Sequence, residues 1–490
     1  MLPAPGPDMT DVKRYPNFID GQWTAEGVEH WLDVVNPATE EVIGAVARSD
    51  AAIVDHAVKA ARKAFPAWRD LGAHRRADIL RKAGERVSAN RQSIGEAMTK
   101  EQGKPLNEAL GEVDKLAKTF AYYAEEAVRV LGYTAPNEEP GHLSLVEKEP
   151  MGVAAAITPW NYPVELIGWK LGAGLAAGCT MVVKPSEWTP LSAIGVIKCL
   201  EEAGLPAGVV NLVNGDGPTT GQALVSHPDI DKIAFTGSLR VGEEIFRTMG
   251  GIKSVSLELG GNCPLLVAPS ADLAAAVKGA VRRSFRNMGQ VCIAINRIYV
   301  HRPLYETFVG EMIAAAGKLV IADGLATPTA DLGPMTNAAG LAKVREHVAD
   351  ALAKGARLGC GGKRPGDKPV GHFYEPTVLA DCTQDMLVMN SETFGPVVGI
   401  SAYDTLDEAI ALANDSQYGL AAYAYTRDAG EMFDLAKKLS FGSVAINNVD
   451  AGIINAPYGG RRKSGTGFEH GREGMEGYLQ FKHVRIRHRA

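Results

Sequence analysis

Two short strings in this sequence contain residue types that together can carry out acyl chemistry. The string G-Q-V-C at 289–292 ends in a cysteine, and E-L-G-G at 258–261 begins with a glutamate. A thiolate can attack a carbonyl carbon, and a carboxylate can then act as the base that activates a water molecule. Cys292 and Glu258 are therefore predicted to form and hydrolyse a thioester.

Asn161 is a third candidate, in the string T-P-W-N-Y-P at 158–163. Its side-chain amide can donate a hydrogen bond to an oxyanion, beside the backbone N–H of Cys292. Each residue alone has a simpler interpretation: Asn161 as a helix cap, a cysteine as a small buried hydrophobe, a glutamate as a surface carboxylate. Their joint occurrence favours a catalytic site.

Two predicted strands are followed by residues that indicate a nucleotide site. Gly237 and Ser238 lie in F-T-G-S-L-R-V-G (235–242), where a strand passes into a helix whose backbone N–H groups can bind phosphate. This string is not the G-x-G-x-x-G fingerprint, and alone it is equally typical of a plain strand-to-helix turn. Lys184 and Glu187 follow another strand, where the ribose of a dinucleotide commonly lies. A carboxylate there repels a 2′-phosphate, so NAD is favoured over NADP.

The elements that must position these residues alternate between strands and helices. Short apolar runs predict strands and longer periodic segments predict helices; the strands are expected at 153–158, 180–185, 209–213, 232–235, 264–267, 297–300 and 443–447, and the helices at 161–176 and 191–203. Such β-α-β units imply a parallel sheet covered on both faces. Residues 50–130 are strongly helical. The segments 142–150 and 478–487 are expected to be exposed strands whose edges a second subunit can complete.

Composition narrows the class of protein. Of the 490 residues, 46% are hydrophobic and 22% charged, which is typical of a soluble globular protein of two or three domains. The net charge of −6 disfavours nucleic acid as the main partner. Six dispersed cysteines without C-x-x-C favour a reducing compartment. The first residues, M-L-P-A-P-G-P-D-M-T, lack the basic and apolar regions of a secretory signal, so we expect no leader, and no apolar run is long enough for a membrane helix. We expect a cytoplasmic protein with no membrane association and no metal site.

Over about residues 15–485 the chain resembles the NAD(P)-dependent aldehyde dehydrogenase superfamily. The matching strings, in family order, are T-P-W-N-Y-P (158–163), K-P-S-E (184–187), F-T-G-S (235–238), E-L-G-G-N (258–262), G-Q-V-C (289–292), E-T-F-G-P (392–396) and P-Y-G-G (457–460). We expect an α/β fold of three parts. These are a Rossmann-like, doubly wound NAD-binding domain, an α/β catalytic domain and a small β oligomerisation element, at residues 1–127 with 150–258, 259–465, and 128–149 with 466–490 respectively.

The resemblance implies a role for each matching position. Cys292 matches the nucleophile that forms a thiohemiacetal with an aldehyde, Asn161 the oxyanion donor, and Glu258 the base for thioester hydrolysis. Lys170 and Glu469 match a pair that carries protons from that base to solvent, although Lys170 can also be structural and Phe468 stands where relatives usually carry Arg. The implied cofactor contacts are Thr158, Trp160, Lys184, Ser186, Glu187, Gly237, Ser238, Leu259, Glu392 and Phe394.

The substrate residues point in two directions. The greatest similarity is to the succinate-semialdehyde dehydrogenase branch, which binds a substrate carboxylate with two arginines and a serine. Arg286 matches one arginine, but Trp169 replaces the other and Gly452-Ile453 occupies the serine region. The remaining expected substrate contacts are Tyr162, Ile293 and Asp450, with Glu165 also near the tunnel mouth.

Three functional hypotheses therefore remain open. The first is oxidation of a small polar or acidic semialdehyde held by Arg286, unless that arginine forms only a structural salt bridge. The second is oxidation of an amino-, betaine- or hydroxy-aldehyde held by the aromatic walls and by carboxylates. The third is a non-catalytic relative that is structural or binds a ligand. A small aldehyde as partner, NAD as cofactor, and a homodimer or dimer of dimers accompany the enzymatic hypotheses.

Overall fold

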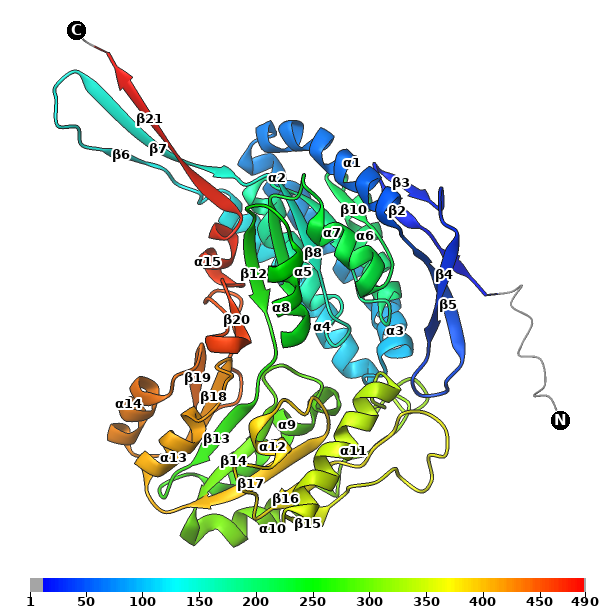
Figure 1. Ribbon diagram of the computed structural model, residues 1–490, viewed down its shortest axis with the longest axis vertical. Coiled ribbons are helices and arrows are strands. Elements are labelled where there is room, and N and C mark those ends of the chain that lie inside the picture. The colour runs from blue at the N-terminus through cyan, green and yellow to red at the C-terminus, as the bar shows by residue number, and fades with distance from the viewer. Residues whose placement is uncertain (1–11, 489–490) are drawn as a thin grey trace.

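The computed structural model describes residues 12–488 of the chain. The N-terminal stretch on which the expected lack of a leader rests lies outside these residues. The described part forms two α/β lobes, and a narrow β arm extends from the first lobe (Figure 1). No helix within 12–488 has the length and apolarity needed to cross a membrane.

The first lobe is built on an eight-stranded sheet of order β20-β12-β11-β8-β9-β10-β2-β3. Its five central strands are parallel, and all except the start of β12 are buried: β8 (Val153–Ile157), β9 (Thr180–Lys184), β10 (Val210–Leu212), β11 (Lys232–Thr236) and β12 (Ser254–Glu258). The flanking strands are antiparallel: β2 (Asn17–Ile19), β3 (Gln22–Thr24) and β20 (Gly465–Thr466). Continuous apolar runs form the centre because both faces of a parallel sheet are covered.

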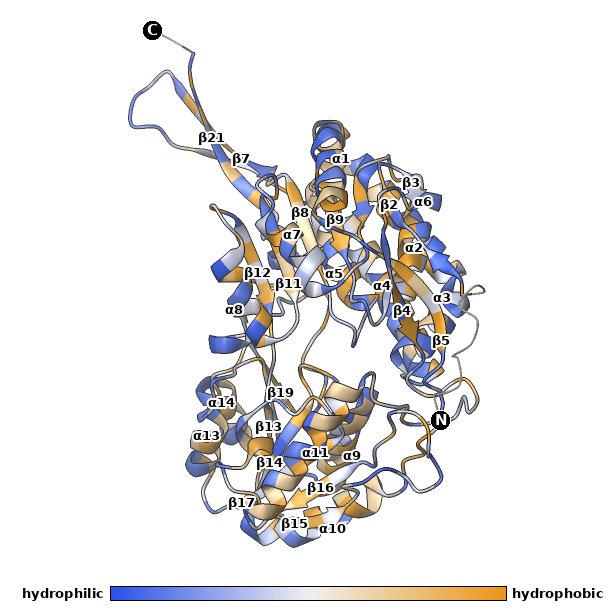
Figure 2. Cartoon of the chain, turned by 45° about the vertical axis from the view of Figure 1, so that its right-hand side comes forward, coloured by the Kyte–Doolittle hydropathy of each residue, from blue (hydrophilic) through white to orange (hydrophobic). Residues whose placement is uncertain are grey.

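Helices cover the two faces of this sheet. Alternate residues of β8 enter different cores, Val153 and Ile157 on one side and Ala154 on the other, as the period of two requires. One face is covered by α1 (Ala51–Asp70), α7 (Gln222–Ser226) and α8 (Leu239–Thr248). The other is covered by α2 (Ala73–Ala89), α3 (Arg91–Gln102), α4 (Leu106–Ala127), α5 (Glu165–Ala177) and α6 (Pro190–Glu202). Hydrophobic residues accordingly gather on the covered strands (Figure 2).

The strand order reverses beside β8. The chain runs from β8 to β9 and β10 on one side, and then crosses to β11 and β12 on the other. Such a reversal leaves a crevice at the carboxyl ends of β8 and β11, where doubly wound sheets bind ligands.

The second lobe contains a seven-stranded sheet of order β15-β16-β17-β14-β13-β18-β19. All neighbours are parallel except β15. Its strands are β13 (Cys263–Val267), β14 (Ile295–His301), β15 (Arg357–Cys360), β16 (Thr377–Ala380), β17 (Val397–Tyr403), β18 (Ala421–Tyr425) and β19 (Ser443–Ile446). Its helices are α9 (Leu273–Phe285), α10 (Tyr305–Ala316), α11 (Ala338–Ala353), α12 (Leu387–Asn390), α13 (Leu406–Asn414) and α14 (Ala429–Lys438).

Two small sheets complete the fold. One contains β1 (Arg14–Tyr15), β5 (Val42–Arg48) and β4 (His30–Val35). The other is the arm, of β6 (Tyr133–Ala135), β7 (His142–Pro150) and β21 (Leu479–Arg487), in which β7 and β21 pair along their whole length. The helix α15 (Gly471–Glu476) leads into β21.

The expected doubly wound α/β fold is confirmed, and the predicted strands and the helical segment 50–130 are present. Two details differ. The helix expected from residue 161 begins at Glu165, because residues 161–164 form a turn at the strand end. The expected boundary at 465/466 falls inside β20, which belongs to the first sheet. The domain limits therefore stay a prediction.

Candidate functional site

The strings that contain Cys292 and Glu258 meet between the two lobes. Glu258 is the last residue of β12, and Cys292 lies just before β14. A Cβ atom on Gly261 would lie 2.4 Å from the carbonyl oxygen of Cys292. Glycine is therefore required there, because the two backbones approach too closely for a side chain.

A turn in left-handed conformation presents the cysteine. Asn287, Met288 and Gly289 have φ angles of 51°, 57° and 67°. Asparagine and glycine tolerate this region, but a buried methionine does so only when surrounding packing imposes it. A Cβ on Gly289 would lie 2.0 Å from the carbonyl oxygen of Gly395, so this position also requires glycine. The turn is thus clamped between elements of the second lobe.

Cys292 lines a cavity of about 350 Å³. This cavity brings together the predicted oxyanion donor and all the predicted substrate residues: Asn161, Tyr162, Trp169, Arg286, Ile293 and Asp450. They come from the turn after β8, from α5, from the loop before β14 and from the segment after β19. The tertiary structure therefore gathers residues that are far apart in the sequence around one thiol.

The residue Cys292 is partly exposed, but its thiol is surrounded by protein that desolvates the ionised form. Burial raises its pKa to about 12, and the negative charges of Glu392 and Glu258 act in the same direction. The hydroxyl of Tyr458 lies 3.3 Å from Sγ and lowers the pKa. Tyr458 was not among the residues singled out from the sequence, although it lies in the P-Y-G-G string.

Glu258 is a buried carboxyl group whose oxygens are open to a ligand. The residue is 3% exposed, and neither carboxyl oxygen has a close hydrogen-bond partner among residues 12–488, although the backbone N–H of Gly460 approaches the carboxyl group and lowers its pKa. Burial, followed by the charge of Glu469, raises its pKa well above the usual value, whereas Lys170 lowers it. Unpartnered carboxyl oxygens in a buried site are suited to hold a water molecule.

Lys170 and Glu469 form a buried ion pair close enough to Glu258 to influence its charge. The Lys170 Nζ donates to Glu469 Oε1 at 2.5 Å and to the Thr236 hydroxyl at 2.6 Å. The second oxygen of Glu469 has no partner within the described chain. The preceding residue, Phe468, is exposed. This arrangement supports the proton-path hypothesis, which stays a prediction.

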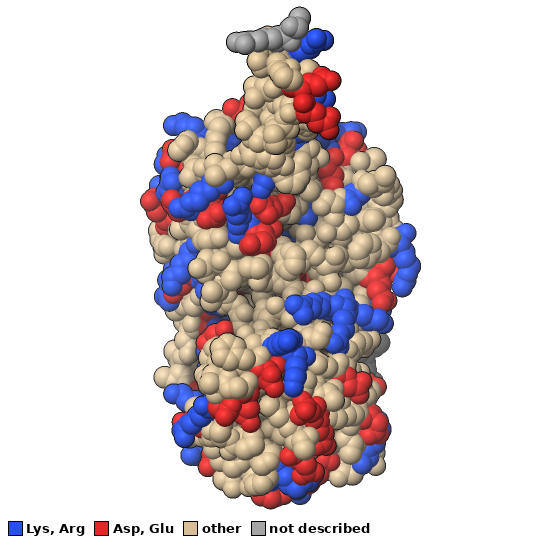
Figure 3. Space-filling view, turned by 90° about the vertical axis from the view of Figure 1, so that its left-hand side faces the viewer, with Lys and Arg blue, Asp and Glu red and all other residues tan. Residues whose placement is uncertain are grey.

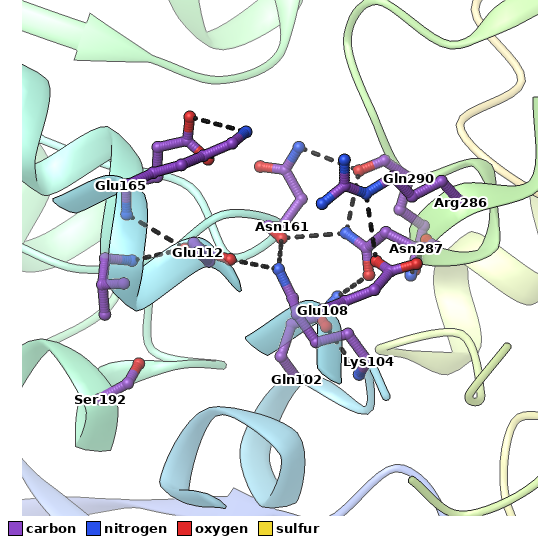
Figure 4. Close-up of polar contacts among 12 residues, drawn as sticks. Gln102, Lys104, Glu108, Glu112, Asn161, Glu165, Ser192, Arg286, Asn287 and Gln290 are labelled. Carbon is purple, nitrogen blue, oxygen red and sulfur yellow. Dashed lines mark hydrogen bonds and ion pairs between the residues drawn. The ribbon is translucent and has the colours of Figure 1, made fainter. Parts of the chain in front are cut away.

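Asn161 is held from both ends. Its backbone carbonyl oxygen accepts hydrogen bonds from Lys104 Nζ at 2.8 Å and from Asn287 Nδ2 at 3.0 Å. Its side-chain Nδ2 donates to the Gln290 backbone carbonyl at 3.0 Å (Figure 4). An amide nitrogen carries two hydrogens, so one remains for an oxyanion. The alternative interpretation of Asn161 as a helix cap is wrong, because the residue preceding α5 is Val164 and it has no side-chain cap.

A buried ion pair behind Asn161 orients it. Lys104 and Glu112 have fully buried side chains, and Lys104 Nζ donates to Glu112 Oε2 at 2.5 Å. The other Glu112 oxygen accepts from the N–H groups of Val164 and Glu165 at 2.9 and 3.1 Å, and so caps α5 (Figure 4). A buried pair of this kind is strongly destabilising when one partner is removed, by about 3–5 kcal/mol.

Sequence reasoning missed Lys104 and Glu112, but a signal existed. Glu112 lies on the apolar stripe of α4 that Ala109, Val113 and Leu116 define. A carboxylate within such a stripe must have a buried cationic partner. The pattern therefore indicates a structural ion pair, although it does not reveal that the pair contacts Asn161.

The candidate cofactor residues of the first lobe lie at the carboxyl ends of neighbouring strands. Thr158 follows β8 and has a buried hydroxyl without a partner among the described residues. Lys184 ends β9; its Nζ donates to the Pro185 carbonyl at 2.9 Å and lies 3.6 Å from Glu187. Ser238 precedes α8, and its hydroxyl accepts the Val241 N–H at 3.4 Å. The orphaned hydroxyl, the lysine and the helix start together fit a dinucleotide.

The remaining cofactor candidates have well-defined packing. Glu392 Oε1 accepts the Gly261 N–H at 3.0 Å, so this carboxylate is tied to the loop after Glu258. The rings of Trp160 and Phe394 meet edge to face, with centroids 5.4 Å apart, and join the two lobes. Three others make local contacts: the Ser186 hydroxyl accepts the Trp188 N–H, Leu259 packs beside Gly242 of α8, and Gly237 lies against the Phe235 ring.

The carboxylates expected near the tunnel mouth already have cationic partners. Asp450 pairs with Arg282 at 2.6 Å and with Arg283 at 2.8 Å. Glu165 pairs with Lys115 at 3.2 Å. Both carboxylates line the cavity, but their charge is neutralised there.

Comparison with known proteins gives consistent matches. A family model described as "Aldehyde dehydrogenase family" matches residues 23–484. The chain is 43% identical to a glutarate-semialdehyde dehydrogenase of Pseudomonas aeruginosa, over 96% of this chain and 97% of that protein. It is 42% identical to a succinate-semialdehyde dehydrogenase [NADP(+)] of Escherichia coli, over 97% and 98%. The crystal structure of lactaldehyde dehydrogenase from Escherichia coli matches with a TM-score of 0.95 and 39% identity, over 97% of this chain and 100% of that one.

Proposed function

Since this chain belongs to the aldehyde dehydrogenase family and is an NAD(P)-dependent enzyme, we propose that Cys292, Glu258 and Asn161 oxidise a small anionic semialdehyde to its acid. The observation that carries this proposal is the convergence of Cys292, Asn161 and Arg286 on one cavity. The comparisons favour neither the non-catalytic hypothesis nor the amino-aldehyde one.

The first half of the reaction forms a thioester. Cys292 Sγ attacks the aldehyde carbon, and the electron pair of the C=O bond moves to oxygen, which accepts hydrogen bonds from Asn161 Nδ2 and the Cys292 N–H. The bound dinucleotide supplies a hydride acceptor at this carbon. Thr158, Lys184, Glu187, Ser238, Trp160, Glu392 and Phe394 would hold that cofactor between the lobes.

The second half releases the acid. Glu258 takes a proton from a water molecule, the water oxygen adds to the thioester carbon, and the C–S bond breaks with its electron pair returning to sulfur. Lys170 and Glu469 then offer the proton a buried route away from Glu258. The reaction consumes one aldehyde, one water and one oxidised dinucleotide, and it would yield one acid, one reduced dinucleotide and one proton.

The charges around the cavity support an anionic substrate. Arg286 lies 3.6 Å from Glu108, measured from Nε to Oε2, which is longer than a close bidentate pair. Asp450 and Glu165 are already neutralised by basic side chains. The cavity therefore offers a guanidinium to a substrate carboxylate or sulfonate, and it has no uncommitted carboxylate for an amine.

Replacing Arg286 by glutamine is expected to reduce kcat/KM for succinate semialdehyde by about 10- to 100-fold, because a hydrogen bond to a charged group is lost. Neutral butanal should lose less than about threefold. Reduced-nicotinamide absorbance measures both rates. Arg282→Gln is the matched control. Arg282 lines the same cavity, but its charge is already neutralised by Asp450. An equal loss for both aldehydes in Arg286→Gln would reject a role in binding the anion.

We also propose NAD as the preferred nucleotide. Glu187 lies where a ribose is expected, and its carboxylate repels a 2′-phosphate. A similar protein of Escherichia coli is named for NADP, so membership of the family does not decide the nucleotide. The proposed preference for NAD therefore rests on Glu187 of this chain. The assay above, run with each nucleotide, decides between NAD and NADP.

All six cysteines are free, which is compatible with the reducing cytoplasm expected from the sequence.

We further propose a homodimer or a dimer of dimers. The arm extends from the first lobe, and it exposes Tyr133 and Phe481 to 60% and 70%. Its edge strands, β21 and β6, can be covered by a second copy. On the face drawn in Figure 3, basic and acidic side chains are intermingled rather than gathered by sign. Light scattering at micromolar concentration should give at least twice the mass of one chain, and a single-chain mass contradicts the proposal.

A further inference from the structure

The hydroxyl of Tyr458 is fixed against the reacting sulfur. Its Oη lies 3.3 Å from Cys292 Sγ, and the residue is 3% exposed. The backbone of Tyr458 exchanges two hydrogen bonds of 2.7 Å with Glu469. Its ring packs against Trp169 and His470, with centroid distances of 5.4 and 5.5 Å. The phenol therefore has one well-defined position, with its hydroxyl directed at Sγ.

When the sulfur is ionised, the Tyr458 hydroxyl must be the hydrogen-bond donor. A thiolate carries no hydrogen, so the hydrogen in the pair must belong to Tyr458. Burial, and next the charge of Cys292, raise the pKa of Tyr458 well above its usual value, so the phenol keeps its proton. Buried donors to an anion form stronger hydrogen bonds than neutral pairs do.

We propose that Tyr458 is a further catalytic residue, whose hydroxyl donates a hydrogen bond to the Cys292 thiolate and stabilises that anion each time it occurs in the reaction. The inference rests on the proposed role of Cys292 as the nucleophile. It concerns a side chain that touches the reacting atom directly, at a position where the isosteric phenylalanine would have no donor.

The hydrogen bond acts at two points of the cycle. During attack, the S–C bond forms and the negative charge leaves sulfur for the substrate oxygen, so the Tyr458 contact weakens. During hydrolysis, the C–S bond breaks, the electron pair returns to sulfur, and the Tyr458 hydroxyl again donates to it. Tyr458 keeps its proton throughout, and the proton of the attacking water goes to Glu258.

Other groups also face the sulfur and set the background against which Tyr458 acts. Glu258 at the end of β12 and Glu392 before β17 oppose ionisation. Cys263 of β13 donates through its Sγ to the Cys292 carbonyl at 3.6 Å, and Tyr423 of β18 donates to the Ile293 carbonyl at 2.8 Å. Both act on the backbone of this loop. Among the described residues Tyr458 is the one side chain with a hydrogen bond to Sγ, and the backbone N–H of Ile293 also lowers the pKa of the thiol.

The test is the pH dependence of Cys292 alkylation in enzyme without substrate. Iodoacetamide reacts with the thiolate, and the Cys292 peptide is quantified by mass spectrometry between pH 6 and 10. In Tyr458→Phe the curve should move to higher pH by about one unit, with about tenfold slower alkylation at neutral pH. Introducing 3-fluorotyrosine at position 458, a stronger donor, should move it to lower pH.

Tyr423→Phe is the matched control, because it removes a buried hydroxyl that donates to the backbone of the same loop and has no hydrogen bond to the sulfur. Its alkylation curve should coincide with that of the unsubstituted enzyme. An unchanged curve in Tyr458→Phe, or an equal shift in Tyr423→Phe, overturns the proposal. If Tyr458→Phe does not fold, the fluorotyrosine variant still decides it. Since no aldehyde is used, this result is independent of whether the proposed substrate is correct.

Discussion

Cys292→Ala is expected to lower the rate of aldehyde oxidation by about four orders of magnitude or more, while cofactor binding is retained. No other side chain that lines the cavity carries a thiol, so the thioester cannot form. The residues that would hold the dinucleotide lie at the ends of β8 and β9, at the start of α8 and before β17, and they do not depend on the sulfur. Reduced-nicotinamide formation measures the first effect, and fluorescence titration with the reduced dinucleotide measures the second.

Cys360→Ala provides the matched control. Cys360 is also partly exposed, but it lies on β15, the edge strand of the second sheet. This variant should keep the activity of the unsubstituted enzyme. Substantial turnover in Cys292→Ala would show that the chemistry does not pass through this thiol.

Glu258→Gln should separate the two halves of the reaction. The thioester can still form, so a rapid burst of about one reduced nucleotide per active site is expected. Steady-state turnover should then fall by about 10²- to 10⁴-fold, because the amide cannot accept a proton from water. Stopped-flow absorbance resolves the burst from the slow phase.

The same variant has a distinct pH dependence. A base must be deprotonated, and burial together with Glu469 raises the pKa of Glu258. Turnover of the unsubstituted enzyme should therefore increase with pH above the range in which an ordinary glutamate ionises. Glu258→Gln should lose this increase. Unchanged steady-state turnover would falsify the assignment of Glu258 as the base.

Most of the fold could be predicted from the sequence, because the local hydrophobic patterns agree with the secondary structure that forms. Apolar runs such as 153–157 are buried on both faces of a parallel sheet, so they are apolar throughout and easy to recognise. The start of α5 was misplaced by four residues, because its first N–H groups are capped by Glu112 from a distant helix. A cap of that kind leaves no trace beside the helix in the sequence.

The sequence by itself was enough to predict the chemistry: a cysteine and a carboxylate in glycine-containing strings, with an amide in T-P-W-N-Y-P, predict a thioester reaction. Only the tertiary structure decided how those groups are tuned. Lys104 and Glu112 lie far from Asn161 in the chain, yet they orient it, and Tyr458 contacts Cys292 although the two are 166 residues apart in the sequence. The burial of these side chains and their hydrogen-bond partners are established only when distant segments pack together, so local sequence patterns do not reveal them.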